Sequence, residues 1–169
     1  SHLDELSIGK DLIKSICSID SLNEKRIIDI IDLKKRLNTI NHFKAKANFT
    51  QIQKVITRIS KLAKNGNLEK NVLLSSGYVN PDLFEKECES KAFQFIKELE
   101  ILIKFPNCDY FKLFNLFENH TNTLNDLFDN EKGVLIMAED SKTRINRLNL
   151  LGLVRNYSLK IADFSKLNQ

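Results

Sequence analysis

Glycine and proline are scarce in this sequence. The 169 residues include 5 glycines and 2 prolines, whereas the two together make up roughly 12% of an average domain. Sandwiches and barrels need a turn residue every few positions, and collagen-like or linker-like chains need many more. The scarcity therefore argues against all of these classes and favours long helices with few joints.

Cysteine and histidine are few and scattered. Cys17, Cys88 and Cys108 form no CxxC pair, and their odd number and wide spacing favour a reducing compartment. The three histidines are equally dispersed, with no HExxH pair and no spacing typical of a zinc site. The sequence therefore predicts no metal site.

Long hydrophobic runs are also missing. A membrane-spanning helix requires about 20 consecutive apolar residues, and the sequence has no such stretch. The first residues show no basic head followed by an apolar run, so we expect no secretory signal. With 42% hydrophobic and 28% charged residues, the composition is typical of a folded chain rather than a disordered one. The length suits one domain or two small ones.

Charge is distributed unevenly along the chain. The formal net charge is +4, but segment 10–70 carries +8 and segment 134–169 carries +3, while segment 71–133 carries −5. A basic face is the electrostatic footprint of a nucleic-acid-binding protein. Solvated helix surfaces produce the same counts, so charge alone leaves both interpretations open.

Apolar residues recur at helical spacing over most of the chain. This periodicity predicts amphipathic helices over residues 3–19, 23–43, 48–65, 81–104, 109–130 and 141–163. In the clearest of them, 48–65, an apolar stripe from Ile52 to Ala63 lies opposite basic residues. We therefore expect an all-α fold, a bundle or array of about five to seven helices.

Local signals mark the ends of these helices. Gly66 is expected to end the 48–65 helix in a left-handed cap, and Pro81 is expected to begin the 81–104 helix. Asp140 is expected to lie in the N-cap region of the last helix. The run 134–137 before it is expected to be a short, buried, extended segment, and Gly152 is expected where two helices pack closely.

Motifs for catalysis are absent from the sequence. It has no GxSxG, no glycine-rich phosphate loop and no Walker-type lysine. Glu85, Glu87 and Glu89 are expected on a solvated helix face, where their charge would raise the pKa of the Cys88 thiol and disfavour a nucleophilic thiolate. We therefore expect no catalytic residue in this chain.

The last helix carries the most specific motif. It consists of Met137-Ala138-Glu139-Asp140, then Arg144, then Asn146-Arg147-Leu148-Asn149-Leu150-Leu151. This arrangement resembles the DALR-type anticodon-binding helix of aminoacyl-tRNA synthetases. Within that group it is most similar to the C-terminal end of glycyl-tRNA synthetase beta subunits, in their cyanobacterial or plastid-like branch. The stretches Leu127-Phe128-Asp129 and Ile161-Ala162-Asp163-Phe164-Ser165 resemble the same family.

The resemblance implies a function. In that family the alpha subunit activates glycine with ATP, and the beta subunit contributes tRNA binding. The chain would then be the tRNA-binding C-terminal part of a beta subunit, with no cofactor of its own and no membrane partner. Its partners would be tRNA(Gly), the alpha subunit or catalytic region, and the rest of the beta subunit. A cytoplasmic location follows, with the plastid stroma as the alternative.

The resemblance also divides the chain. Residues 1–66 would form a basic N-terminal helical segment, and residues 67–169 would form the DALR-like anticodon-binding helical domain, unless the two are one continuous domain. Thr143 stands where the DALR pattern prefers leucine, and Leu127 stands where this family often has phenylalanine. Both are expected to be packing positions.

Basic residues of two predicted helices are the candidate tRNA contacts: Lys54, Arg58, Lys61, Arg144, Arg147 and Arg155. The first three share one helix face and would contact phosphates. The three arginines of the last helix would approach the anticodon arm, because an arginine fork binds phosphates and base edges with two hydrogen bonds. Candidate base stackers near loops are Tyr78, Phe105 and Tyr110, for which core packing is the competing explanation.

Two other interpretations stay open. A helical protein–protein docking module without direct RNA contact requires an exposed apolar patch of a few hundred Å², and the acidic segment 71–133 would face its partner. An anticodon domain of another DALR-type synthetase is the second, although the terminal segment 161–165 argues against it. RNA binding instead requires that the basic residues share one surface with little acid between them.

Overall fold

The described part of the chain contains six α-helices and two short 3-10 helices, with no strand. The computed structural model describes residues 26–106 and 108–167, so the helix expected over residues 3–19 lies outside the described residues. The α-helices are α3 (Arg26–Lys44), α4 (Phe49–Ala63), α5 (Glu87–Leu102), α6 (Tyr110–Asn119), α7 (Thr121–Asp126) and α8 (Ser141–Leu159). The 3-10 helices are η1 (Pro81–Leu83) and η2 (Phe164–Lys166). The all-α prediction is confirmed.

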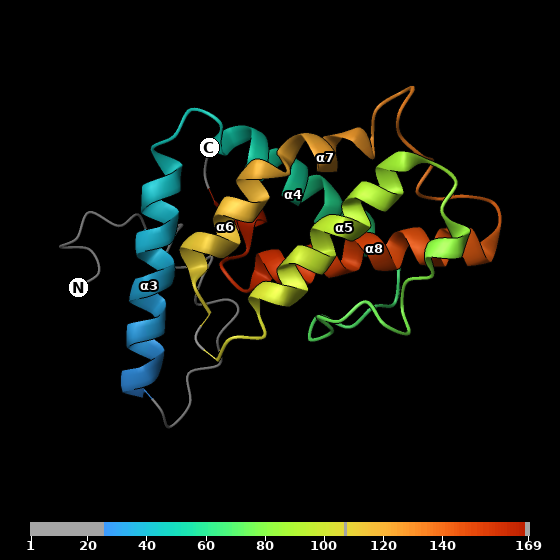
Figure 1. The fold of residues 1–169 in the computed structure, drawn as a ribbon. Helices are drawn as coiled ribbons and strands as arrows, with labels where there is room; N and C mark the ends of the chain where they lie inside the picture. Colours follow the sequence, from blue (N-terminus) through green and yellow to red (C-terminus); the bar gives the residue numbers. More distant parts are fainter. Residues whose placement is uncertain (1–25, 107, 168–169) are drawn as a thin grey trace.

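The helices form two layers. In Figure 1, α5, α6 and α7 lie in front of α4 and α8, and α3 stands upright at the left edge. The most extensive contact between helices is that of α4 with α8; α5 contacts α8 and α7, and α3 contacts α6 and α4. Since α4 also contacts α6, α7 and η2, it is the central helix of the fold.

The sequence of α4 explains its central place. Ile52, Val55, Ile56 and Ile59 follow the helical period and are each at most 3% exposed, as the periodicity predicts. Burial of each such side chain contributes about 1.5–3 kcal/mol. The buried polar Gln53 donates its Nε2 to the carbonyl oxygens of Phe164 (3.2 Å) and Leu167 (2.8 Å), which fastens η2 to α4.

Phenylalanine rings join four elements at one end of the core. Phe43 of α3 stacks on Phe114 of α6 with ring centroids 4.3 Å apart, and Phe49 of α4 stacks on the same ring at 5.9 Å. Phe164 of η2 lies 5.8 Å from Phe114. All four rings are buried. Phe114 is therefore the hub through which α3, α4 and η2 pack on α6.

Two predicted helix boundaries are wrong. The helix expected from Pro81 is interrupted: Asn80 caps the short η1 by accepting from the Asp82 amide (3.0 Å), and α5 begins only at Glu87. The Glu89 carboxylate accepts from the Glu85 and Lys86 amides, which fixes that later start. The helix expected over 109–130 is divided at His120 into α6 and α7.

Gly66 does not have the expected left-handed conformation. Among the described glycines, Gly77 alone has a positive φ, of 83°. A Cβ on Gly66 would lie 3.0 Å from the Cβ of Leu148, so this glycine allows the end of α4 to approach α8 closely. Gly152 is at a close contact, because a Cβ at this position would lie 2.8 Å from Leu68 Cδ2, but the helix packing expected there is wrong. Its neighbour belongs to a loop rather than to a helix.

Two apolar expectations are wrong. Helical periodicity predicts Ile145 on the inner face of the last helix, yet its side chain is 55% exposed. In the run 134–137, Ile136 is buried, but Leu135 is 70% exposed and Met137 is 44% exposed. Within the part of the chain described, no helix is both long enough and apolar enough to span a bilayer.

Candidate nucleic-acid interface

The start of α8 is fixed by Asp140. Its Oδ2 accepts from the Thr143 backbone amide (2.9 Å) and from the Thr143 hydroxyl (2.8 Å). These two hydrogen bonds hold the pKa of Asp140 below its usual range. The N-cap prediction is confirmed, and Thr143 is buried. The hydroxyl at this position supplies a second bond to the cap, which a leucine would not make.

Arg144 stabilises the turn that precedes α8. Its Nη1 donates to the carbonyl oxygens of Ala138 (2.8 Å) and Glu139 (3.0 Å). The side chain as a whole is partly exposed. Arg144 therefore combines a structural role in the turn with an accessible positive charge.

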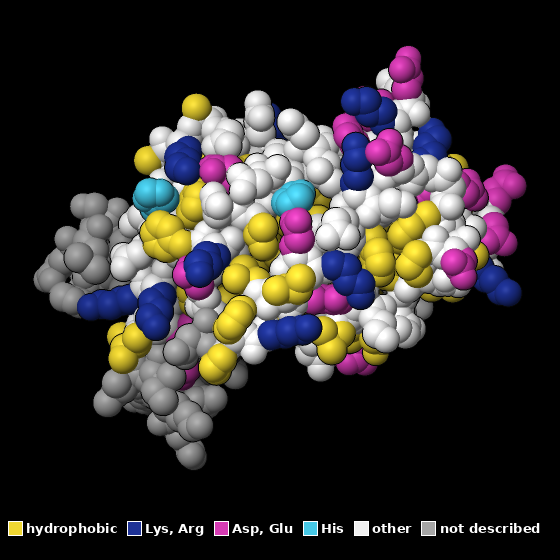
Figure 2. Space-filling view, viewed as in Figure 1, with side chains coloured by type: hydrophobic (Ala, Val, Ile, Leu, Met, Phe, Trp, Pro, Cys, Tyr) yellow, Lys and Arg dark blue, Asp and Glu magenta, His cyan; other side chains and the backbone are white. Residues whose placement is uncertain are grey.

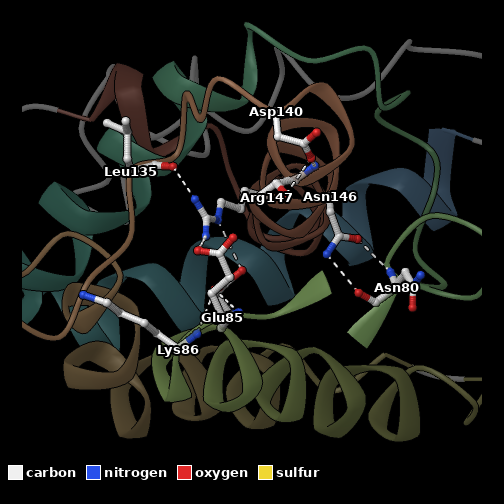
Figure 3. Close-up of polar contacts among 9 residues, drawn as sticks. Asn80, Glu85, Lys86, Leu135, Asp140, Asn146 and Arg147 are labelled. Carbon is white, nitrogen blue, oxygen red and sulfur yellow. Dashed lines mark hydrogen bonds and ion pairs between the residues drawn. The ribbon is translucent and has the colours of Figure 1, made fainter. Parts of the chain in front are cut away.

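Arg147 is buried in an ion-paired cluster (Figure 3). Its side chain is 5% exposed and lies 3.3 Å from Oε2 of Glu89 and 3.3 Å from Oε2 of Glu85. Its Nη1 donates to the carbonyl oxygen of Leu135 (2.8 Å). Glu89 is 1% exposed, so its expected place on a solvated helix face is wrong. The cluster joins α8, α5 and the 134–137 segment.

Two asparagines of α8 hold the irregular segment 67–80, which we call the connector. Asn146 Oδ1 accepts from the Asn80 amide (2.7 Å) while its Nδ2 donates to the Asn80 carbonyl oxygen (3.0 Å). Asn149 Nδ2 donates to the carbonyl oxygen of Tyr78 (2.8 Å). Figure 3 shows the Asn146 amide directed at the Asn80 peptide groups. A segment without regular structure needs partners for its backbone groups, and α8 supplies them.

The far half of α8 continues this arrangement. Arg155 Nη2 donates to the Leu68 carbonyl oxygen (2.8 Å), and Asn156 Nδ2 donates to those of Glu69 (2.8 Å) and Val72 (2.7 Å). The Tyr157 hydroxyl donates to the Leu73 carbonyl oxygen (2.5 Å). Burial lowers the pKa of Arg155 and raises the pKa of Tyr157. We call these connector-binding side chains the α8 polar row: Asn146, Asn149, Arg155, Asn156 and Tyr157.

A second set of polar side chains lies on α4 and faces solvent. Lys54, Arg58 and Lys61 are all exposed, and α4 contains no acidic residue. Among the described residues, none of the three forms an ion pair. The Arg58 guanidinium lies over the Phe128 ring, 4.3 Å from its centroid, which restricts its orientation. We call these three residues the α4 basic row.

The structure therefore separates the six candidate tRNA contacts. It brings Lys54, Arg58 and Lys61 together on one exposed face. Arg144 is partly exposed, whereas Arg147 and Arg155, at 5% and 7% exposed, direct their guanidinium groups at carbonyl and carboxylate oxygens inside the fold. RNA contact by any of the six stays a prediction.

Sequence reasoning missed the asparagines of the α8 polar row and the partner of Arg147. One signal was available: asparagine is a poor helix former because its side chain competes for backbone hydrogen bonds. Yet α8 contains three asparagines, Asn146, Asn149 and Asn156. Their presence inside a helix indicates that these side chains make specific hydrogen bonds.

The described residues include no group of three or more histidines, cysteines, aspartates or glutamates arranged to hold a metal ion. Cys88 is buried, and burial together with the charge of Glu89 raises the pKa of its thiol. The side chains assembled around α4 and α8 are exposed cations on one helix and the residues that fasten a loop on the other. The fold and this arrangement define an all-helical module.

The comparisons with known proteins show which proteins the chain is similar to. No protein-family model matches the chain. It is 33% identical over 164 residues to the glycine–tRNA ligase beta subunit of Picosynechococcus sp. and 30% identical over 164 residues to that of Acaryochloris marina, in both cases over 95% of this chain and 23% of the relative. The beta subunit of Thermodesulfovibrio yellowstonii is 32% identical over 99% of this chain and 22% of its own length.

The chain is homologous to a segment of glycine–tRNA ligase beta subunits, as the motif of the last helix predicts. The relatives from Picosynechococcus and Acaryochloris are 33% and 30% identical to it, which agrees with the predicted cyanobacterial branch. The chain spans less than a quarter, 23%, of the length of these relatives.

Proposed function

We propose that this chain is the tRNA-binding, anticodon-region C-terminal part of the beta subunit of a glycine–tRNA ligase. It supports ATP-dependent glycylation of tRNA(Gly), which is catalysed elsewhere in the enzyme. Its partners are tRNA(Gly), the alpha subunit or catalytic region, and the rest of the beta subunit. It works in the cytoplasm, or in the plastid stroma if it comes from that branch. The homology to beta subunits over 95% of the chain supports this proposal.

The α4 basic row is the proposed phosphate-binding surface, and it is the observation that carries the proposal. Its three cations are exposed on a helix without acids, so they present a positive face with no neighbouring charge on α4 to neutralise it. Each phosphate that such a cation neutralises releases counterions, which contributes roughly −0.7 to −0.9 to the slope of log affinity against log salt.

The arginines of α8 have different roles in this proposal. Arg144 contacts the anticodon arm directly, because its side chain is partly exposed. Arg147 and Arg155 act as positioning residues: Arg147 holds the Leu135 carbonyl and the start of α5, and Arg155 holds the Leu68 carbonyl. Their loss would disturb RNA binding by releasing the segments that they fasten.

The alternative, a protein docking module without RNA contact, has one observation in its favour. Large apolar side chains are exposed at Ile101 (58%), Phe105 (66%) and Leu135 (70%). Figure 2 shows hydrophobic side chains at the surface between charges of both signs on the face formed by α3, α5 and α6. This face is formed by helices other than α4, so docking on it and RNA binding through α4 use different elements of the fold.

A binding titration tests the proposal. The chain is titrated with tRNA(Gly), with the same tRNA carrying a swapped anticodon, and with an unrelated tRNA, each at two salt concentrations. We expect the tightest binding to tRNA(Gly), weakened by salt and by the anticodon swap. Equal and negligible affinity for all three RNAs would refute the proposal in favour of the docking module.

A further inference from the structure

The connector presents an exposed tyrosine on a fixed backbone. Tyr78 is 45% exposed and follows Gly77, whose φ of 83° forms the turn. The Tyr78 amide donates to the Ser75 carbonyl oxygen (2.9 Å), and Asn149 of α8 donates to the Tyr78 carbonyl oxygen (2.8 Å). The Ser75 amide in turn donates to the buried Glu100 (2.6 Å). The ring therefore stands on a preorganised support, which reduces the entropy that binding would cost.

A groove runs along α8 on both sides of this tyrosine. Tyr78, Ile145 and Asn149 line two adjoining hollows, one reaching to Asn67 and the other to Pro81. Ile145, which helical periodicity predicts in the core, is 55% exposed here. The groove thus offers an aromatic ring and a branched apolar side chain at the same hollows, each about half exposed.

Polar groups at the groove suit a nucleotide. Lys142 lines one hollow, and the other begins at Asn67, three residues after the exposed Lys64 at the end of α4. Asn67 lies on the segment that follows α4 in the chain, so this hollow borders the segment that leaves the end of α4. The amide nitrogen of Asn149 donates to the Tyr78 carbonyl oxygen, whereas its amide oxygen has no hydrogen-bond partner among the described residues. Of the described residues that line either hollow, Glu69 is the one acid.

We propose that this groove receives an unpaired nucleobase of the bound RNA, which stacks on Tyr78 and contacts Ile145. Lys142 meets the adjoining phosphate, and the Asn149 amide oxygen accepts a hydrogen bond from the base edge. Single-stranded bases are recognised in this way, by aromatic stacking combined with nearby cations. The proposal rests on the proposed function, since it names the part of the RNA that the groove binds.

Fluorescence tests the stacking directly, because the sequence contains no tryptophan. Tyr78→Trp introduces a single reporter at the groove, and Phe111→Trp introduces one at a similarly exposed aromatic position, 43% against 45%. Each variant is titrated with the anticodon stem-loop of tRNA(Gly) and with a duplex RNA of the same length. In the Tyr78→Trp variant we expect strong quenching by the stem-loop and weak quenching by the duplex. In the Phe111→Trp variant we expect quenching by neither.

Affinity measurements distinguish a failure of the groove proposal from a failure of RNA binding itself. Tyr78→Ala is expected to weaken stem-loop binding about 5- to 150-fold, and Tyr78→Phe and Phe111→Ala are expected to leave it nearly unchanged. The groove proposal is wrong, and the proposed function stands, if the unmodified chain and Tyr78→Ala bind the stem-loop equally well and the Tyr78→Trp variant shows no quenching. If the unmodified chain binds no RNA, both are wrong.

Discussion

Asn146 pairs with the peptide groups of Asn80 as a neighbouring strand would. Its amide oxygen accepts from the Asn80 N–H at 2.7 Å and its amide nitrogen donates to the Asn80 carbonyl at 3.0 Å, across 66 residues of sequence. One side chain thereby satisfies both backbone groups at the point where the connector meets η1. The position of the Tyr78 groove depends on this pair.

Asn146→Ala removes both bonds at once. A buried polar group left without a partner costs about 1–3 kcal/mol, so we expect the free energy of unfolding to fall by about 2 kcal/mol. Asn149→Ala, which removes one bond from a partly exposed site, is the matched control and should cost about 1 kcal/mol. Urea denaturation measures both, and equal losses would contradict the larger role of Asn146.

Arg147→Ala leaves the buried Glu89 without its cation. Removing one partner of a buried ion pair costs about 3–5 kcal/mol, and we expect a loss in this range. Arg144→Ala, on the same helix but partly exposed, should cost about 1 kcal/mol. The double variant Arg147→Met, Glu89→Gln should lose less than the sum of its single changes, because each single change strands a charge or a donor. Additive losses would show that the pair is not coupled.

Gly133→Ala and Gly152→Ala test two kinds of close approach. A Cβ on Gly133 would lie 2.4 Å from the Asp129 carbonyl oxygen and 2.6 Å from that of Leu127, and backbone atoms cannot move aside cheaply. A Cβ on Gly152 would meet Leu68 Cδ2 at 2.8 Å, the movable end of a side chain. We expect Gly133→Ala to lower the free energy of unfolding by about 3 kcal/mol or more. Gly152→Ala should cost less, since alanine favours the helix by about 1 kcal/mol.

Thermal melts of the two glycine variants provide the comparison. We predict a clearly lower melting temperature for Gly133→Ala than for Gly152→Ala. The reverse order would mean that the turn at Gly133 rearranges more easily than the packing of Leu68 on α8.

Glu100 makes the stability of the protein depend on pH. Burial alone would raise the pKa of this carboxyl, but the Ser75 amide and the nearby Lys97 outweigh burial and lower it below its ordinary value of 4.5. A carboxyl with a depressed pKa in the folded state contributes stability above the unfolded pKa and loses it as the pH falls through the folded pKa. Chemical denaturation between pH 7 and pH 3 should therefore show Glu100→Gln at its largest disadvantage near neutrality. A disadvantage that is independent of pH would contradict this assignment.

Some local features of this protein could be predicted from its sequence, whereas its long-range contacts could not. The apolar stripe of α4 and the Asp140 cap depend on residues within one or two turns of each other, so spacing alone reveals them. The Arg147–Glu89 and Asn146–Asn80 contacts join residues 58 and 66 positions apart. Their partners are decided by how α5 and the connector pack on α8, which periodicity does not encode.

The same reason explains the mixed outcome for the candidate site. Charge and helical spacing place Lys54, Arg58 and Lys61 on one exposed face, as the structure does, because exposure follows from their position opposite the apolar stripe. In α8 both faces are buried along most of its length, so charge no longer identifies the solvent face. Sequence reasoning therefore predicts Arg147 and Arg155 as exposed cations although they lie inside.

The most direct test of phosphate binding by α4 compares two triple variants in their affinity for tRNA(Gly). One replaces Lys54, Arg58 and Lys61 by glutamine, and the control replaces three other exposed lysines, Lys34, Lys35 and Lys104, so that both lose the same charge. At physiological salt, distant charges are largely screened. We predict that the first variant binds tRNA(Gly) about tenfold or more weakly. The slope of its log affinity against log salt should become shallower by about 2–3. The control variant should change little in either quantity. Equal losses in the two variants would contradict the claim that α4 binds the phosphates.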